Sequence, residues 1–296
     1  MNPAPIALFA YKRPDHLKRV VDSLLRNALA PQSELFIFSD GPRNTEVETA
    51  VAELRKYLRT ITGFKKVIIT ERAENFGLAK NIIDGVTSVV DLHGKIIVLE
   101  DDLVLSPYYL EFMNEALEKY QDVEEVISIH GYSYPISYAK PVYFLRGADC
   151  WGWGTWKRGW DLFNPDTQFL LDEIRRKDLS YAFNMDDSYD YTGMLKAQIE
   201  GRVDSWAIRW YASAFLENKL TLYAYPSLLE NIGMDDATHG QDPGLTDTDL
   251  TDHRIVLEDI PVEETIAARK LIARHLYRNM PMRAKIKRLL KRGLGS

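Results

Sequence analysis

Short apolar runs alternate with segments of helical periodicity through the first 130 residues, and this alternation constrains the fold more than any other feature of the sequence. The apolar runs lie at 6–11, 35–38, 67–69, 95–99 and 126–129. The segments between them, in which apolar residues recur every three or four positions, begin near Asp15, Thr45, Leu78 and Ser106. Repeated strand–helix–strand units of this kind predict an α/β fold with a doubly wound, mostly parallel sheet.

The rest of the chain has a different character but no clear boundary. Residues 142–165 are rich in Trp, Gly and Tyr, and residues 172–204 have a polar, helical pattern. No internal repeat or low-complexity linker divides the chain. We therefore predict one domain over residues 1–268, made of two halves at 1–130 and 131–268.

The composition excludes several classes of protein. Hydrophobic residues make up 46% of the chain, yet no apolar run approaches the roughly 18 to 20 residues of a membrane-spanning helix. The only cysteine, Cys150, rules out a disulfide framework or a multi-cysteine zinc site and favours a reducing, cytoplasmic location. With 37 basic and 43 acidic residues, the net charge of −6 argues against nucleic acid as a partner.

Three adjacent carboxylates, Glu100, Asp101 and Asp102, directly follow the apolar run at 95–99. Adjacent carboxylates repel one another, so this arrangement costs stability unless a cation or a basic group neutralises it. Hard oxygen ligands suit Mg²⁺ or Mn²⁺, which often bind one or two carboxylates together with substrate phosphates. The alternative is a solvated acidic turn that caps the following helix.

Other polar residues also lie just beyond predicted strands. Arg13 precedes the first helix, where a guanidinium can contact phosphate or a base, although an ordinary exposed arginine is the alternative. Asp40 can accept a hydrogen bond from a base or serve as a turn residue, and Asn81 can contact a ligand or cap the third helix. Because ligands of such sheets bind beyond the carboxyl ends of the strands, we expect these residues to converge on one rim with the acidic triplet.

A series of short motifs occurs in a fixed order over residues 5–242. The motifs are Ala10-Tyr-Lys-Arg-Pro14, Phe38-Ser-Asp40, Asn75-Phe-Gly-Leu-Ala79, Val98-Leu-Glu-Asp-Asp102, Leu105-Ser-Pro107, Cys150-Trp-Gly-Trp-Gly-Thr-Trp156, Asp204-Ser-Trp206 and Asn231-Ile-Gly233. In this order they resemble the A-type (GT-A) nucleotide-sugar glycosyltransferases, above all the relatives of N-acetylglucosaminyltransferase I and the bacterial family-2-like enzymes.

The resemblance implies the GT-A, or nucleotide-diphospho-sugar transferase, fold. It implies that residues 1–130 bind the nucleotide and that residues 131–268 bind the acceptor. Asp102, as the last acid of the triplet, is then the direct ligand of a Mn²⁺ or Mg²⁺ ion on the donor diphosphate. Glu100 and Asp101 are implied to contact the ribose and the sugar of the donor.

Three further residues are implied to bind the nucleotide. Arg13 and Asp40 match residues that hold the nucleotide in the family. Asn81 falls where the relatives have a nucleotide-contacting histidine, so this chain departs from their pattern there.

The resemblance also assigns a base and a second metal ligand. Inverting transfer needs a carboxylate within hydrogen-bond reach of the acceptor hydroxyl, and Asp204 matches the acid in that role. Ser205 stands where the relatives have a second aspartate, and Asp186 and Asp187 form a competing pair whose alternative is a solvated helix start. His239 is expected to complete the metal shell, with a hydrogen-bonding loop histidine as the alternative.

The C-terminal segment, residues 269–296, is a basic tail. It carries ten Lys and Arg residues and no acidic residue. After Pro281, residues 283–292 form a basic amphipathic pattern that can contact an anionic membrane surface. The alternative is a solvated terminal helix or tail.

Together these features predict a metal-dependent, inverting hexosyl- or N-acetylhexosaminyltransferase. The donor is expected to be a nucleotide-diphosphate sugar, with UDP favoured by the resemblance, and the acceptor a hydroxyl of a glycan or a lipid-linked glycan in surface polysaccharide synthesis. The expected location is cytoplasmic, with peripheral contact to the inner face of the membrane. The alternatives are a sugar-phosphate nucleotidyltransferase and a catalytically silent sugar- or membrane-binding relative.

Overall fold

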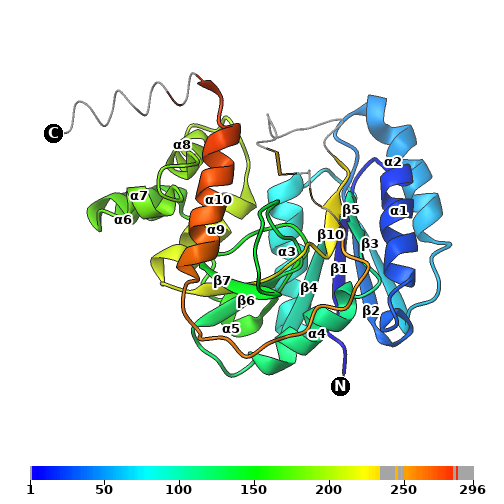
Figure 1. The fold of residues 1–296 in the computed structure, drawn as a ribbon. Helices are drawn as coiled ribbons and strands as arrows, with labels where there is room; N and C mark the ends of the chain where they lie inside the picture. The colour runs from blue at the N-terminus through cyan, green and yellow to red at the C-terminus, as the bar shows by residue number, and fades with distance from the viewer. Residues whose placement is uncertain (1, 234–243, 246–247, 249, 283–284, 286–296) are drawn as a thin grey trace.

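The computed structural model describes residues 2–233, 244–245, 248, 250–282 and 285. Its centre is an eight-stranded sheet with the strand order β3-β2-β1-β4-β8-β6-β9-β7 (Figure 1). The strands of this sheet are β1 (Ile6–Ala10), β2 (Glu34–Ser39), β3 (Lys66–Glu71), β4 (Lys95–Glu100), β6 (Val126–His130), β7 (Val142–Arg146), β8 (Trp153–Trp156) and β9 (Leu220–Ala224). A separate ribbon pairs β5 (Leu103–Leu105) with β10 (Leu229–Asn231) in antiparallel orientation.

The first half of the sheet is parallel, as the sequence predicts. Strand β1 pairs in parallel with β2 and with β4, and β2 pairs in parallel with β3. In the second half β6 and β9 are parallel, whereas β8 runs antiparallel to both β4 and β6, and β7 antiparallel to β9. The predicted α/β class with a mostly parallel sheet is confirmed, and β8 joins the two halves into one sheet.

Helices cover both faces of the sheet because the strands are apolar on both sides. Along β1, Ile6 and Leu8 belong to one core cluster, while Ala7 and Phe9 belong to another. The first cluster receives α1 (Pro14–Leu25), α2 (Thr45–Leu58), α4 (Tyr109–Lys119) and α10 (Ile266–Asn279). The second receives α3 (Leu78–His93), α5 (Lys157–Trp160) and α9 (Trp206–Leu216).

The Trp-rich segment contributes to both clusters, with Trp156 in the first and Trp153 and Trp160 in the second. Trp153 is fully buried, and its ring lies 5.5 Å from that of Trp206 and 5.6 Å from that of Trp210, measured between centroids. Stacking on a sugar face, one of the uses that tryptophans can have in a sugar-binding protein, is therefore not available to Trp153.

A small helical group packs on the outer side of α9. It consists of α6 (Thr167–Arg176), α7 (Ser180–Phe183) and α8 (Tyr191–Ile199), and Figure 1 shows it on the side of the molecule away from α1 and α2. The core of this group contains Leu170, Ile174 and Phe183, which pack with Phe215 of α9. The polar helical pattern over residues 172–204 corresponds to this group. A short 3-10 helix, η1 (Ala30–Gln32), leads into β2.

The predicted basic tail begins inside α10, which packs on the body of the protein. Ile272 and Leu276 are buried there, and Arg269 is only 6% exposed. The basic amphipathic segment expected at 283–292 lies, apart from Lys285, outside the described residues. Within the part of the chain that is described, no helix is long and apolar enough to cross a membrane.

Candidate active site

The acidic triplet and Arg13 meet at the carboxyl edge of the sheet, although they are far apart in the sequence. Strand β4 ends at Glu100, and Arg13 is the N-cap residue of α1, just beyond β1. The Nη2 atom of Arg13 lies 2.7 Å from Oδ1 of Asp101 and 2.8 Å from Oδ2 of Asp102. The backbone N–H of Tyr11 donates a second bond to Asp101, 3.2 Å from Oδ2. The convergence predicted for strand-end residues is therefore observed for Arg13 and the triplet.

This cluster holds more negative charge than Arg13 can balance. Asp101 is 5% exposed, and burial raises the pKa of its carboxyl group. Burial, together with the charges of Asp102 and Asp101, raises the pKa of Glu100 to about 8. Such shifts mark a site where a further positive charge is stabilising.

The chain leaving β10 lies against Asp102. The backbone N–H of Ile232 donates to the carbonyl oxygen of Asp102 at 2.9 Å, and Nη1 of Arg13 lies 3.5 Å from the carbonyl oxygen of Gly233. A Cβ atom on Gly233 would lie only 2.1 Å from Oδ2 of Asp102. Residue 233 therefore has to be a glycine for Asp102 to keep this position. His239 lies outside the described residues.

The donor set fits a hard divalent cation only in part. Within the described ranges, no group of three or more His, Cys, Asp or Glu side chains is arranged to hold a metal ion. Ions such as Mg²⁺, however, commonly take one or two carboxylates and complete their shell with substrate phosphates and water. The oxygen-only chemistry fits that mode of binding, as does the surplus of carboxyl groups over the single guanidinium of Arg13.

Asp40 connects β2 to the loop that precedes α3. Its Oδ1 accepts hydrogen bonds from the backbone N–H groups of Gly41 and Phe76, both at 2.8 Å. Its Oδ2 accepts from the N–H of Gly77 at 3.0 Å and from the side-chain amide of Asn75 at 3.1 Å. These four bonds come from the protein itself, so Asp40 shapes the loop at the rim, and its predicted contact with the nucleotide stays a prediction.

Asn81 is buried beside an arginine that sequence reasoning missed. Its Oδ1 accepts a hydrogen bond of 3.1 Å from Nε of Arg72, which also pairs with Asp84. The guanidinium of Arg72 lies 4.6 Å from the centroid of the Phe76 ring. Arg72 directly follows β3, so the same strand-end rule that singled out Arg13 and Asp40 could have identified it.

Asp204 lies at the start of α9 and has no contact with the triplet or with Arg13 among the interactions of the described residues. Its exposed carboxylate pairs with Arg209 at 3.3 Å. Both residues line an open groove of about 570 Å³ together with Lys80 and Asp84 of α3. The competing candidate Asp186 is paired with Arg269 at 2.9 Å and holds α10 in place.

One further carboxylate that lines a cavity, Asp149, is not identified by the sequence analysis. It lines a cavity of about 100 Å³ with four tyrosines, Tyr134, Tyr191, Tyr211 and Tyr223. Its Oδ2 accepts hydrogen bonds from the hydroxyls of Tyr134 at 2.9 Å and Tyr223 at 3.4 Å. Neither strand-end position nor helical period marks Asp149, so no pattern in the sequence could have found it.

The part of the chain that carries this site is similar to a known protein family. The family model described as Glycosyl transferase family 2 matches residues 6–174, a span that includes Arg13, the acidic triplet and Asp149 but not Asp204. No curated protein matches the chain. Among solved structures, S. aureus TarS is 7% identical with a TM-score of 0.40, covering 76% of this chain and 36% of TarS.

A cytidylyltransferase from Leptospira borgpetersenii serovar Hardjo-bovis (strain JB197) is 12% identical with a TM-score of 0.33, covering 59% of this chain and 65% of that chain. The chain thus spans about a third of TarS and somewhat less than two thirds of the cytidylyltransferase. The family match covers more than half of the chain and runs from β1 into α6, through Arg13, Asp40 and the acidic triplet. The chain therefore belongs to glycosyl transferase family 2.

Proposed function

We propose that this protein transfers a hexosyl or N-acetylhexosaminyl group from a nucleotide-diphosphate sugar to a hydroxyl group, with inversion at the anomeric carbon. UDP is the favoured nucleotide, and the acceptor is a glycan or a lipid-linked glycan in surface polysaccharide synthesis. Membership of glycosyl transferase family 2 favours this reaction over nucleotidyl transfer. The presence of all three acids of the triplet favours it over a catalytically silent relative.

The observation that carries the proposal is the meeting of Arg13 with Asp101 and Asp102 at the rim of the sheet. A guanidinium recognises phosphate oxygens, and the start of α1 next to it favours negative charge. In the proposed complex Arg13 and Asp40 hold the nucleotide, and Glu100 and Asp101 contact the ribose and the sugar. Asn81 acts through Arg72, to which it is hydrogen-bonded.

The proposed cofactor is Mn²⁺ or Mg²⁺. Asp102 would hold the ion, Glu100 is the second carboxylate nearby, and His239 is the further ligand that the resemblance implies. When bound, such an ion stabilises the negative charge that develops on the departing diphosphate. The resemblance places the general base at Asp204.

The proposed location is the cytoplasmic surface of a membrane. The basic segment after Pro281 would contact anionic lipid, with about 1 kcal/mol for each cation near the surface. A lipid-linked acceptor would be concentrated at that surface.

The proposal is tested by a thermal-shift screen of UDP, GDP and dTDP sugars, each with Mn²⁺ and with EDTA. We expect one nucleotide to raise the melting temperature in Mn²⁺ and to have little effect in EDTA. The control is Asp102→Ala, in which the metal-dependent part of the shift is lost. If no nucleotide sugar shifts the melting temperature, the silent-relative alternative is favoured and the proposed reaction is rejected.

A further inference from the structure

The segment that carries Asp149 runs into the candidate donor site. Strand β8 is antiparallel to β4, and the last residues to pair are Trp153 and Val98. The chain entering β8 therefore lies at the sheet edge where β4 leads into the acidic triplet. In keeping with this, burial and the charges of Asp149, Glu100 and Asp102 raise the pKa of the Cys150 thiol well above its usual value.

The carboxylate of Asp149 is surrounded by donors that fix its orientation. Oδ2 receives the Tyr134 and Tyr223 hydroxyls, and Oδ1 receives the backbone N–H of Cys150 at 2.8 Å. Burial and the charge of Asp149 raise the pKa of both tyrosines well above the usual value, so both stay protonated and donate. A carboxylate has about four acceptor positions. The remaining one is near the Cys150 thiol, a weak donor that a hydroxyl can displace.

The cavity in front of Asp149 has a size suited to one hydroxyl-bearing group. Its volume of about 100 Å³ leaves room for more than one water-sized group. A sugar hydroxyl or hydroxymethyl group fits this space. Asp149 is itself half-buried.

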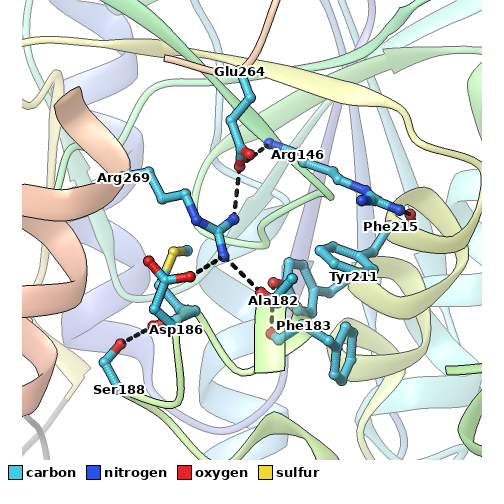
Figure 2. Close-up of polar contacts among 10 residues, drawn as sticks. Arg146, Ala182, Phe183, Asp186, Ser188, Tyr211, Phe215, Glu264 and Arg269 are labelled. Atoms are coloured by element: carbon cyan, nitrogen blue, oxygen red, sulfur yellow. Dashed lines mark hydrogen bonds and ion pairs between the residues drawn. The ribbon is translucent and has the colours of Figure 1, made fainter. Parts of the chain in front are cut away.

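The walls of the cavity are held by hydrogen bonds of Tyr211 and Arg146. Tyr211, which lines it, donates to the carbonyl oxygen of Phe183 at 2.9 Å, and Arg146 bonds to the carbonyl oxygen of Phe215 at 2.9 Å. Figure 2 shows these groups beside Arg269, which joins Asp186 to Glu264. The cavity is thus formed before any ligand binds.

Building on the proposed function, we propose that Asp149, rather than Asp204, is the carboxylate that accepts the proton of the attacking hydroxyl. The O–H proton passes to Asp149 while the hydroxyl oxygen forms a bond to the anomeric carbon of the donor. The bond from that carbon to the diphosphate oxygen breaks, and its electron pair leaves with the diphosphate. Asp149 becomes a neutral carboxylic acid and returns its proton to water after the product departs.

Two observations favour Asp149 over Asp204. Asp149 lies just before β8, at the sheet edge where β4 leads into the triplet, whereas Asp204 pairs with Arg209 in a groove lined by the first turns of α3. Asp149 also lies in a small cavity in which tyrosine hydroxyls position its carboxylate, while the side chain of Asp204 is 62% exposed. A base is more effective where it is fixed and shielded, because it then needs no reorganisation during proton transfer.

The test is the hydrolysis of UDP-glucose and UDP-N-acetylglucosamine in the presence of Mn²⁺. Water takes the place of the acceptor hydroxyl, and the rate is measured as the release of UDP. Asp149→Ala is expected to lower turnover about 100-fold or more while its affinity for UDP and Mn²⁺ stays within about twofold. Sodium formate, a small carboxylate that fits the vacated space, is expected to restore turnover in Asp149→Ala. Asp172→Ala, which removes an exposed carboxylate of α6, is the matched control.

The outcomes separate this assignment from the proposed function. Turnover of Asp149→Ala close to that of the unaltered protein, or a loss that formate does not reverse, overturns it. The assignment is also overturned if only Asp204→Ala loses turnover and recovers it in formate. If the unaltered protein binds no nucleotide, the proposed function itself fails and this assignment fails with it.

Discussion

Close packing of Gly233 on Asp102 makes a single methyl group a probe of the proposed donor site. In Gly233→Ala the new Cβ would lie 2.1 Å from Oδ2 of Asp102, so the carboxylate has to move away from Arg13. We expect the affinity for UDP with Mn²⁺ to fall tenfold or more, measured by titration calorimetry. The melting temperature should change little, because the clash is with the end of a side chain rather than with the core. Unchanged affinity would show that the position of Asp102 does not matter for the nucleotide.

Asp40 is expected to matter more for stability than its place at the rim suggests. In Asp40→Asn one oxygen becomes an amide group that donates, so it faces N–H donors of the loop at 75–77 without accepting their bonds. Leaving buried donors unsatisfied costs about 1–3 kcal/mol, which is the expected loss in the free energy of unfolding in urea. Asn75→Ala removes only one of the four donors and is expected to cost less. Equal stability of Asp40→Asn and the unaltered protein would contradict the loop-holding role.

His130 makes the stability of the fold depend on pH. The side chain is fully buried, and burial lowers its pKa below the usual value of about 6.5. A histidine that is neutral when folded binds more protons when unfolded, so its contribution to stability is present above about pH 6.5 and is lost as the pH falls through the folded pKa. The urea midpoint of the unaltered protein should therefore fall between pH 7.5 and pH 5 more steeply than that of His130→Gln. Parallel curves would rule out His130 as the source.

For single residues, the sequence predicts the place in the candidate site best where the residue directly follows a strand. Arg13 and the triplet were found because a strand end fixes the edge of the sheet on which they lie. Asp149 was missed because its position depends on β8 entering the sheet beside β4 and on tyrosines from separate elements. The placement of Asp204 in a groove beside α3 likewise depends on how α9 packs, which no local pattern reveals.

Among the elements, α10 is held to the helical group by one buried arginine. Arg269 bonds to Asp186 at 2.9 Å, to Glu264 at 2.8 Å and to the carbonyl oxygen of Ala182 at 2.9 Å. Asp186 lies in a run of three residues with positive φ, 48° at Met185, 56° at Asp186 and 59° at Asp187. Non-glycine residues in that region cost of order 1–3 kcal/mol each, so the ion pairs have to hold this run in place.

Arg269→Met is therefore expected to destabilise the protein by about 3 kcal/mol, because two carboxylates then lose their buried partner. The measurement is urea unfolding, with limited proteolysis to detect opening near residues 182–188. Lys270→Met, a change at the exposed neighbouring position of α10, is the control and is expected to be neutral. Loss of stability in both variants alike would show that the charge of the helix, and not the contacts of Arg269, is responsible.

Prediction of the elements was better in the first half of the chain than in the second. Strands β1 to β4 and β6 stand out as apolar runs between helical segments. Strand β8 did not, since its Trp, Gly and Thr residues show neither simple alternation nor a continuous aliphatic run. What makes it a strand is pairing with β4 and β6 on both sides, a tertiary effect.

For the whole molecule, the concentration of basic residues near the C-terminus predicts that membrane contact can be removed without loss of catalysis. Removal of residues 283–296 takes away six Lys and Arg residues but leaves α10 and its buried contacts in place. We expect the truncated protein to keep its melting temperature and its hydrolysis of nucleotide sugar, and to lose sedimentation with phosphatidylserine vesicles. A truncated protein that still sediments with the vesicles would place the membrane contact elsewhere.

The insertion of β8 between β4 and β6 has a consequence for substrate entry. Two lobes joined by a hinge can open to admit a substrate, but here the proposed nucleotide-binding and acceptor-binding halves share the backbone hydrogen bonds of one continuous sheet. Their spacing is set by strand geometry, so binding has to be accommodated by loops at the rim. By the same reasoning, deleting one residue between Cys150 and Trp153 would displace Asp149 relative to β8 by about one residue length, roughly 3.3 Å, and so change its distance from the acidic triplet.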